Sequence, residues 1–267
     1  MTAGSNNRVY NCRIFDLTLN AATGIVNGIS ISGSTVVSAL VYNNLIGDLK
    51  APTASSTNEV IRGIAVAATT TNATYNVYYN TVYLSATSAG INFSTTGIFH
   101  AASATTTTAV LNMRNNIIYN ISTPNGSGRT VAYRRLSNAL GNYASTSNNN
   151  FFFAGTASAT RLLFYDATNS VQTIAAYKTL VSPMDAASVS EDLTGKFVST
   201  SGLNSNFLHI VPGSVTQVEG GAVNIAGIVG DADGQSRQGN PGYAGTGSAP
   251  DIGADEFDGG KNTLGYL

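Results

Sequence analysis

The chain has 267 residues, enough for one large domain or two ordinary ones with a sizeable buried core. Charged residues make up 10% of it, and 13 basic against 14 acidic residues leave a formal net charge of -1. This balance gives no field that would attract nucleic acid, and no apolar run reaches the roughly 18 residues needed for membrane insertion. Cys12 is the only cysteine, which excludes a disulfide framework and a thiolate metal cluster.

Two short motifs recur along the first 155 residues with a common period. The first is an asparagine pair, or its equivalent, followed by apolar residues, and its fourth positions lie 32, 36, 36 and 34 residues apart. These fourth positions are Ile14, Ile46, Val82, Ile118 and Phe152. The second motif is out of phase with the first and begins at Gly28, Gly63, Gly97 and the degenerate Thr130. Two independent markers with one period predict a solenoid in which each period forms one coil.

Within each coil we expect three short strands, for example residues 63–68, 75–79 and 81–86. These segments are β-branched or aromatic, alternate with period two and are bounded by Thr, Ser, Asn or Gly. Helical repeats would instead show a 3.6-residue period with Ala, Leu, Glu and Lys prominent. The sequence therefore predicts an all-β fold, a right-handed single-stranded parallel β-helix. Residues 1–160 would form about five coils, the first of them incomplete.

Equivalent residues of successive coils should lie above one another, because stacked parallel strands are about 4.8 Å apart. One column, at the sharp bend between the second and third strands, would consist of Cys12, Asn44, Asn80, Asn116 and Asn150. We expect its stacked amides to hydrogen-bond to one another and its asparagines to adopt left-handed backbone. The inward column before the bend would be Val9, Val41, Val77, Met113 and Ser147, and the fourth positions of the motif would point inward after it.

The same alternation predicts two outward stripes that flank the bend. Before the bend the stripe would be Tyr10, Tyr42, Tyr78, Arg114 and Asn148, and after it Phe15, Gly47, Tyr83, Tyr119 and Phe153. Sugar rings stack on exposed aromatic rings, so we expect a polysaccharide or cell-surface glycan to bind at Tyr10, Tyr42, Tyr78, Tyr83 and Tyr119. The alternative is a plain surface, because exposed tyrosine is also a good strand former.

An enzyme hypothesis centres on His100 and Tyr133, which occupy equivalent positions when the motifs of adjacent coils are aligned. Alternation points both inward, which predicts a buried, hydrogen-bonded pair. With the register shifted by one residue, these two side chains and Arg134 or Arg135 would instead face a groove. There they could supply the base and the cation that a polysaccharide lyase needs.

After residue 155 the period fades, and residues 161–267 are expected to form the last coil or coils and a cap of the same domain. Residues 171–181 read as a short amphipathic helix through Ile174, Tyr177 and Leu180. An irregular segment beyond this helix would cover the last open coil. His209 lies in the apolar stretch 207–211 and is expected to be structural.

The closing segment carries two motifs, Asp231-Ala-Asp233-Gly-Gln-Ser-Arg237 and Pro250-Asp-Ile-Gly-Ala-Asp-Glu-Phe257. They resemble the closing segment of pectate-lyase-like right-handed β-helix domains in large secreted bacterial surface proteins, and the Asn-Asn-x-Ile coils resemble the same family's repeats. The resemblance implies an extracellular or cell-surface location, with neighbouring domains in a longer parent protein. We expect a structural or adhesive module that binds glycans; the alternative is a lyase or glycoside hydrolase acting on an extended polysaccharide.

The carboxylates of the closing segment allow two kinds of chemistry. Asp231 and Asp233 resemble the start of a calcium loop, where alternating carboxylates converge on the cation; capping of the loop by Arg237 and backbone groups is the alternative. No other cofactor is expected. Three further acids could form the acid and base of a glycosidase or could tie down the cap: Asp251, Asp255 and Glu256.

Overall fold

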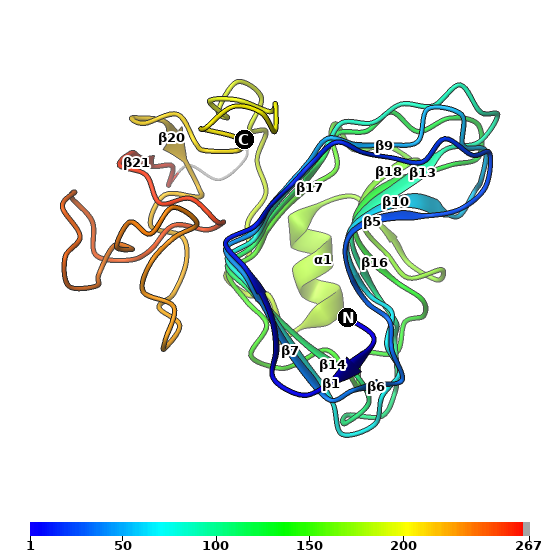
Figure 1. Ribbon diagram of the computed structural model, residues 1–267, viewed down its shortest axis with the longest axis horizontal. Helices are drawn as coiled ribbons and strands as arrows, with labels where there is room; N and C mark the ends of the chain where they lie inside the picture. The colour runs from blue at the N-terminus through cyan, green and yellow to red at the C-terminus, as the bar shows by residue number, and fades with distance from the viewer. Residues whose placement is uncertain (264–267) are drawn as a thin grey trace.

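The computed structural model describes residues 1–263 and shows a parallel β-solenoid with a looped C-terminal region beside it (Figure 1). Three sheets form the walls of the solenoid. Sheet 1 consists of β5 (Val26–Ile31), β10 (Glu59–Val66), β13 (Ser94–His100), β16 (Thr130–Arg135), β18 (Arg161–Tyr165) and β19 (Ser170–Val171). Sheet 2 consists of β2 (Asn7–Tyr10), β7 (Ser38–Tyr42), β11 (Thr74–Tyr78) and β14 (Val110–Arg114). Sheet 3 consists of β3 (Arg13–Ile14), β8 (Leu45–Ile46), β12 (Thr81–Leu84), β15 (Ile117–Asn120) and β17 (Phe151–Phe153).

Every neighbouring pair in these three sheets is parallel except β18 with β19, so the predicted parallel β-helix is confirmed. Three smaller parallel pairs complete the strands. They are β1 (Ala3–Gly4) with β6 (Thr35–Val36), β4 (Leu17–Thr18) with β9 (Leu49–Lys50), and β20 (Val215–Thr216) with β21 (Gly260–Lys261). The predicted segment 75–79 corresponds to β11 and the segment 81–86 to β12, each within two residues.

The asparagine column at the bend between sheets 2 and 3 is confirmed as a hydrogen-bonded ladder. Asn44 Nδ2 donates to Asn80 Oδ1 at 2.8 Å, and Asn80 Nδ2 donates to Asn116 Oδ1 at 2.9 Å. Asn116 Nδ2 continues the ladder to Asn150 Oδ1 at 2.9 Å. At the other end Cys12 contributes its backbone N–H, which donates to Asn44 Oδ1 at 3.1 Å. The ladder amides are fully buried, so these hydrogen bonds replace those that the amides would form with water.

The expectation that the ladder asparagines themselves adopt left-handed backbone is wrong. The positive φ angles fall one residue earlier, at Asn11, Asn43, Tyr79, Asn115 and Asn149. The preceding residue makes the turn, and the amide of the ladder residue lies along the stack. Asparagine predominates at the preceding position because it tolerates positive φ better than most side chains.

Both inward columns lie in one apolar core inside the coils. Val41, Val77 and Met113 are completely buried, and so are Ile46, Val82, Ile118 and Phe152 of the other column. Each such side chain contributes about 1.5 to 3 kcal/mol of burial free energy. The glycine motif follows from this packing, because a Cβ at Gly63 would lie 2.3 Å from Val82 Cγ1 and 2.6 Å from the oxygen of Gly97.

The helix α1 (Ile174–Val181) covers the end of the last coil and is visible across the inside of the coils in Figure 1. Its N-cap Thr173 accepts a hydrogen bond from Ala176 N, and Tyr177 and Val181 are buried in the coil core. The predicted helix is therefore confirmed with a shorter N-terminal end. Among residues 1–263, no helix is long and apolar enough to cross a membrane.

The rest of the C-terminal region does not close the end of the coils as expected. Figure 1 shows it, in yellow to red, beside the bend between sheets 2 and 3. Ile210, Val218, Ile252 and Phe257 share a second apolar cluster with residues on the outward side of the coils, among them Tyr119. The helix and the following residues 185–189 cover the last coil, since Asp185 N donates to Ser147 O and Val189 N donates to Asn150 O. The segment beyond them packs against the flank of the solenoid.

Candidate functional site

The tyrosine stripes expected to bind glycans exist as stacked rings. Ring centroids lie 4.9 Å apart for Tyr10 and Tyr42, 5.6 Å for Tyr83 and Tyr119, and 5.0 Å for Tyr119 and Phe153. Their exposure differs along the stack: Tyr10 is 48% exposed, Tyr78 is 8% exposed and Tyr119 is 1% exposed. The stripes therefore form an open surface only near the N-terminal coil.

The flanking C-terminal region covers the remainder of these stripes. Phe197 packs edge-on against Tyr83 at 5.4 Å and against Tyr119 at 5.8 Å. Tyr119 Oη donates a hydrogen bond to Asp192 Oδ1 at 2.7 Å, and burial raises the pKa of Tyr119 far above its ordinary value. The expectation of a continuous outward glycan face is corrected here, because side chains that point away from the coil are buried by a later part of the chain.

His100 and Tyr133 are not equivalent residues of adjacent coils. His100 pairs with Arg135, and Tyr133 pairs with Ile98, two residues away from the predicted register. A shift of two preserves the side-chain direction, so both side chains still point inward and both are completely buried. The buried pair expected from alternation is thus present, although Tyr133 Oη lies 3.5 Å from His100 Nδ1.

A third buried residue, Arg135, completes this interior cluster. Its Nη1 donates to His100 Nδ1 at 2.6 Å and to Tyr133 Oη at 3.0 Å, and its Nη2 donates to Asn142 Oδ1 at 2.8 Å. Burial, and then the charge of Arg135, lower the pKa of His100 well below its ordinary value. The neutral imidazole is an acceptor enclosed in the core. Three of the four lyase candidates therefore lie inside the coils, where no polysaccharide can reach them.

The fourth candidate, Arg134, lies on the outer face of sheet 1 in a cluster that we call the arginine–aromatic face. Its members are Glu59, Arg62, Phe99, Arg129, Arg134 and Tyr165. Stacking of the coils builds it, because Arg134 pairs with Phe99 on one side and with Tyr165 on the other. The sequence analysis missed the remaining members because it followed only the stripes beside the bend.

Charge and aromatic contacts organise this face. Glu59 bridges two arginines, with Arg134 Nε at 2.7 Å and Arg62 Nη2 at 3.4 Å. The guanidinium carbons of Arg129 and Arg134 lie 4.7 Å and 4.5 Å from the centre of the Tyr165 ring. Within residues 1–263 Arg129 has no carboxylate at ion-pair distance, so the face keeps a net positive charge.

A small cavity of about 110 Å³ opens in this face. Its lining residues are Thr57, Asn58, Glu59, Ser94, Arg129, Val131, Arg134 and Tyr165. Hydroxyl, amide, guanidinium and phenol groups converge there, and this combination suits a hydroxylated ligand that carries a negative charge.

The two aspartates of the expected calcium loop have different partners. Asp231 Oδ1 accepts the backbone N–H groups of Asp233 at 3.0 Å and Gln235 at 2.8 Å, and Oδ2 accepts that of Glu256 at 3.1 Å. Asp231 therefore caps its own loop through backbone donors. Asp233 faces His209 instead, and calcium binding by the two aspartates stays a prediction.

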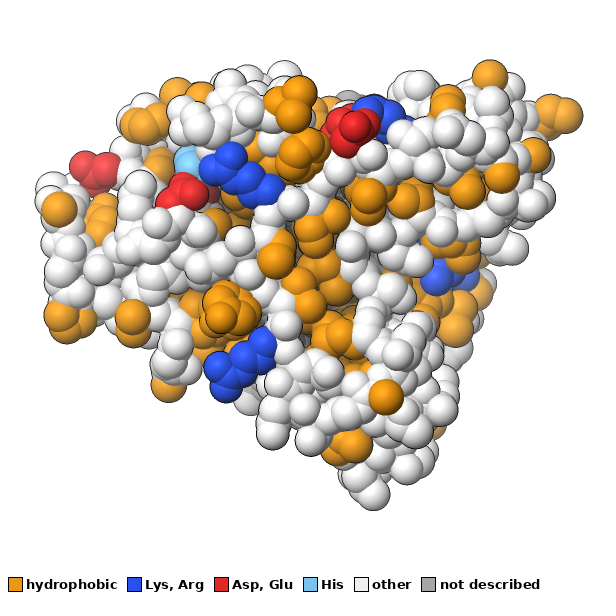
Figure 2. Space-filling model, viewed as in Figure 1, with side chains coloured by type: hydrophobic (Ala, Val, Ile, Leu, Met, Phe, Trp, Pro, Cys, Tyr) orange, Lys and Arg blue, Asp and Glu red, His pale blue; other side chains and the backbone are white. Residues whose placement is uncertain are grey.

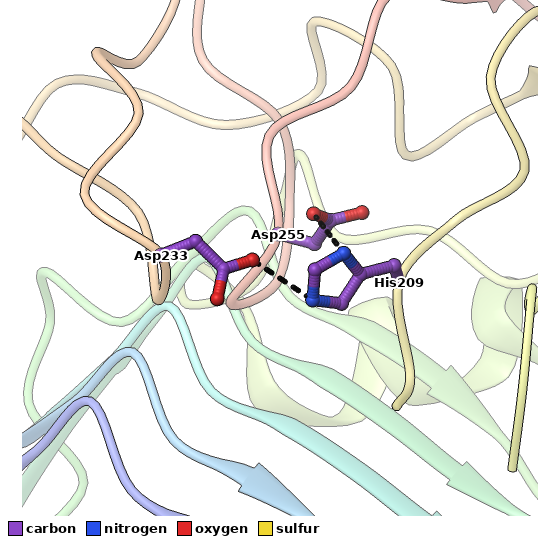
Figure 3. Close-up of side chains that lie close together, drawn as sticks. All are labelled: His209, Asp233 and Asp255. Atoms are coloured by element: carbon purple, nitrogen blue, oxygen red, sulfur yellow. Dashed lines mark ion pairs between the residues drawn. The ribbon is translucent and has the colours of Figure 1, made fainter. Parts of the chain in front are cut away.

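Asp233, His209 and Asp255 form a second cluster (Figure 3). His209 lies between the two carboxylates, with Nε2 at 2.9 Å from Asp233 Oδ2 and Nδ1 at 3.5 Å from Asp255 Oδ1. Asp255 Oδ2 also accepts the N–H of Ile210 at 2.7 Å. Burial raises the pKa of Asp255 to about 8. Asp233 and Asp255 are candidates in the sequence, but their contact with His209 could not be predicted, because the three residues are more than 20 positions apart and follow no spacing rule.

The closing motif fastens the C-terminal region, as its capping interpretation expected. Asp251 accepts the N–H groups of Gly220 at 2.6 Å and Phe257 at 2.9 Å. Glu256 Oε2 accepts from Arg237 Nη1 at 3.1 Å, and Arg237 Nη2 donates to Asn43 Oδ1 at the bend of the coils at 2.9 Å. Asp251 and Glu256 are thus occupied by structural donors, which favours the capping interpretation over an acid and base pair for glycoside hydrolysis.

No family model, no curated protein and no solved structure matches this chain. The parallel β-solenoid stands on the strand pairing alone. The arginine–aromatic face combines a cavity, two aromatic rings and, among residues 1–263, an arginine without a carboxylate partner.

Proposed function

We propose that this chain is an extracellular structural and adhesive β-helix module of a larger secreted or cell-surface bacterial protein, and that it binds an acidic glycan. The resemblance of its closing motifs and coils to pectate-lyase-like β-helix domains supports the location and the parent protein. The stacked coils provide a regular support, on which a ligand can lie along one wall. The arginine–aromatic face would be the contact surface.

The observation that carries this proposal is the pair of arginines over Tyr165. A uronate or sulfate group pairs with a guanidinium, and the face of a sugar ring packs on an aromatic ring. Arg129 contacts the Tyr165 ring and has no carboxylate partner among residues 1–263, so its charge is available to a ligand. Tyr10, half exposed and stacked on Tyr42, offers a second aromatic contact on sheet 2.

The alternative, a polysaccharide lyase or glycoside hydrolase, has less support. A lyase needs a base within reach of the substrate, and His100 is completely buried inside the coils. Arg134 alone remains accessible, and its Nε is held by Glu59 at 2.7 Å.

Titration of the purified chain with polygalacturonate, and with neutral dextran as the comparison, tests the proposal. We expect saturable binding to polygalacturonate that weakens with added salt, because screening acts on the exposed part of an arginine contact. Tyr165→Ala should lower the affinity about fivefold, which corresponds to about 1 kcal/mol for a cation–ring or stacking contact.

The matched control is Lys261→Ala, which removes an exposed cation of the flanking region, away from both aromatic surfaces. It should bind polygalacturonate as the unaltered chain does, whereas Arg129→Ala should bind more weakly. Equal binding to dextran would contradict the acidic-glycan proposal. Release of unsaturated products that absorb ultraviolet light would establish the lyase alternative instead.

A further inference from the structure

The cluster of His209, Asp233 and Asp255 brings together three ligand groups from three separate segments of the C-terminal region. One ligand atom of each residue lies within 4.8 Å of the other two. Figure 3 shows the imidazole between the carboxylates, with each of its nitrogens directed toward one of them. The side chain of His209 is 15% exposed, that of Asp255 is 7% exposed and that of Asp233 is 33% exposed, so the cluster is accessible from one side.

The contacts within the cluster leave donor capacity unused. His209 Nε2 is buried and has no partner in hydrogen-bonding geometry, even though Asp233 Oδ2 approaches it to 2.9 Å. Arg13, the nearest cation to Asp233, lies 3.7 Å from its other oxygen. A buried imidazole nitrogen without a hydrogen bond, beside two carboxylates, is the arrangement that a cation would satisfy.

The ligand types distinguish between cations. Calcium prefers six to eight oxygen ligands, and an imidazole nitrogen is foreign to it. Zinc and its neighbours bind imidazole nitrogen together with carboxylate oxygen, at bond lengths of about 2.0 to 2.2 Å. Three protein ligands with the remaining position open to water is a common zinc arrangement.

We propose that His209, Asp233 and Asp255 form a binding site for a divalent transition-metal ion of the zinc class. The ion would join the segment around His209, the loop that carries Asp233 and the closing motif that carries Asp255. These segments meet the coils close by, since Ala254 N donates to Thr81 Oγ1 at 2.9 Å and the neighbouring Phe207 is completely buried. Metal binding would therefore fasten the C-terminal region to the flank of the solenoid.

Titration of the chelator-treated full chain with Zn²⁺ and with Co²⁺ tests this site. We expect one equivalent to bind, a visible absorption band for the Co²⁺ form, and a rise in the thermal midpoint with Zn²⁺ that equal Ca²⁺ does not produce. His209→Gln and Asp233→Asn should each weaken Zn²⁺ binding by at least about 10- to 100-fold, because that loss already follows when a group that only supports a metal ligand is removed. Asp233 is one-third exposed, so its variant is expected to fold.

The matched control is Asp258→Asn, an exposed acid of the same region that contacts Thr246 and lies outside the cluster. It should bind Zn²⁺ as the unaltered chain does. The proposal is overturned if the unaltered chain binds no Zn²⁺ saturably. It is also overturned if Asp233→Asn, with an unchanged circular dichroism spectrum, retains full affinity, or if Asp258→Asn loses as much affinity as the two cluster variants.

Discussion

The coils and the flanking C-terminal region reach stability by different routes. In the coils each residue meets its own equivalent one period away, so a favourable contact such as the asparagine ladder is repeated at every turn. The flanking region has little regular structure beyond β20 and β21, and a non-repeating apolar cluster together with single polar side chains holds it in place. Figure 2 shows that acidic and basic side chains are few on the visible face of both parts, among white polar and orange hydrophobic side chains. A single substitution should therefore affect the unfolding of the coils and of the flanking region differently.

The largest effect is expected from Arg237→Met in the flanking region. Arg237 is completely buried, pairs with Glu256 and Asn43, and lies over the Tyr79 ring at 3.9 Å. Its loss leaves Glu256 buried without its counter-charge, which costs about 3 to 5 kcal/mol. Urea unfolding and limited proteolysis should show the flanking region released first while the coils keep their strand signal. Lys261→Met, at an exposed position, is the control, and simultaneous loss of both parts would contradict the separation.

A somewhat smaller loss is expected from Asn80→Ala in the middle of the ladder. The substitution removes the acceptor of Asn44 Nδ2 and the donor to Asn116 Oδ1, both buried. Buried polar groups left without partners cost about 1 to 3 kcal/mol. Urea unfolding should show this loss in a single transition of the coils, while the exposed Asn58→Ala stays within about 0.5 kcal/mol of the unaltered chain. If Asn80→Ala is as stable as Asn58→Ala, the asparagine ladder does not contribute to the stability of the coils.

Above pH 7, where His100 of the coils is neutral in the folded and the unfolded chain, a pH effect on stability should be confined to the flanking region. Burial, and then the negative charge of Glu256, raise the pKa of Asp251 above its ordinary value. The folded chain therefore holds a proton that the unfolded chain releases near pH 4, so stability falls as pH rises from that value toward the folded pKa. The urea midpoint of the flanking region should fall between pH 7 and pH 9, and the midpoint of Asp251→Asn should fall less steeply. Parallel slopes would assign the pH dependence to other groups.

The smallest effect is expected from Thr173→Ala at the start of α1. Thr173 Oγ1 accepts a hydrogen bond from Ala176 N at 3.3 Å, and loss of such a cap costs about 1 kcal/mol. Thr179→Ala, on the exposed side of the same helix, serves as the control because alanine favours helix. Thermal unfolding should distinguish the two variants, and an unchanged midpoint for Thr173→Ala would mean that packing of Tyr177 alone positions the helix.

Most of the coil geometry could be predicted because repetition makes single residues comparable. The positions of Asn44, Asn80 and Asn116 and the inward columns followed from spacing alone. The register of His100 was misjudged by two residues because Ala132 replaces the glycine that marks this position in earlier coils. The predicted inward direction of the His100 side chain was still correct, because residues two positions apart lie on the same face of a strand.

The flanking region and its contacts could not be predicted by the same means. Phe197 covers Tyr119, and His209 meets Asp233 and Asp255, through contacts that occur once and leave no period in the sequence. The closing motif indicated that Asp251 and Glu256 fasten a terminal region, but not that this region lies along the flank. An outward position in a coil is therefore a weak guide to exposure when a hundred further residues follow.

All the amide hydrogen bonds of the asparagine ladder point in one direction along the stack of coils, and this determines how the last coil can end. The Nδ2 group of each ladder asparagine donates to the Oδ1 atom of the asparagine in the next coil. The last one, Asn150, therefore needs an acceptor that is not itself a donor. Asp185 Oδ1 supplies it at 3.0 Å, while its other oxygen accepts from Tyr177 at 2.6 Å. A carboxylate accepts hydrogen bonds and does not donate them, so Asp185 ends the chain of amide hydrogen bonds. The helix α1 ends the stack of coils sterically. An extra coil inserted after Asn150 would need an asparagine of its own, which would accept from Asn150 Nδ2 and donate to Asp185.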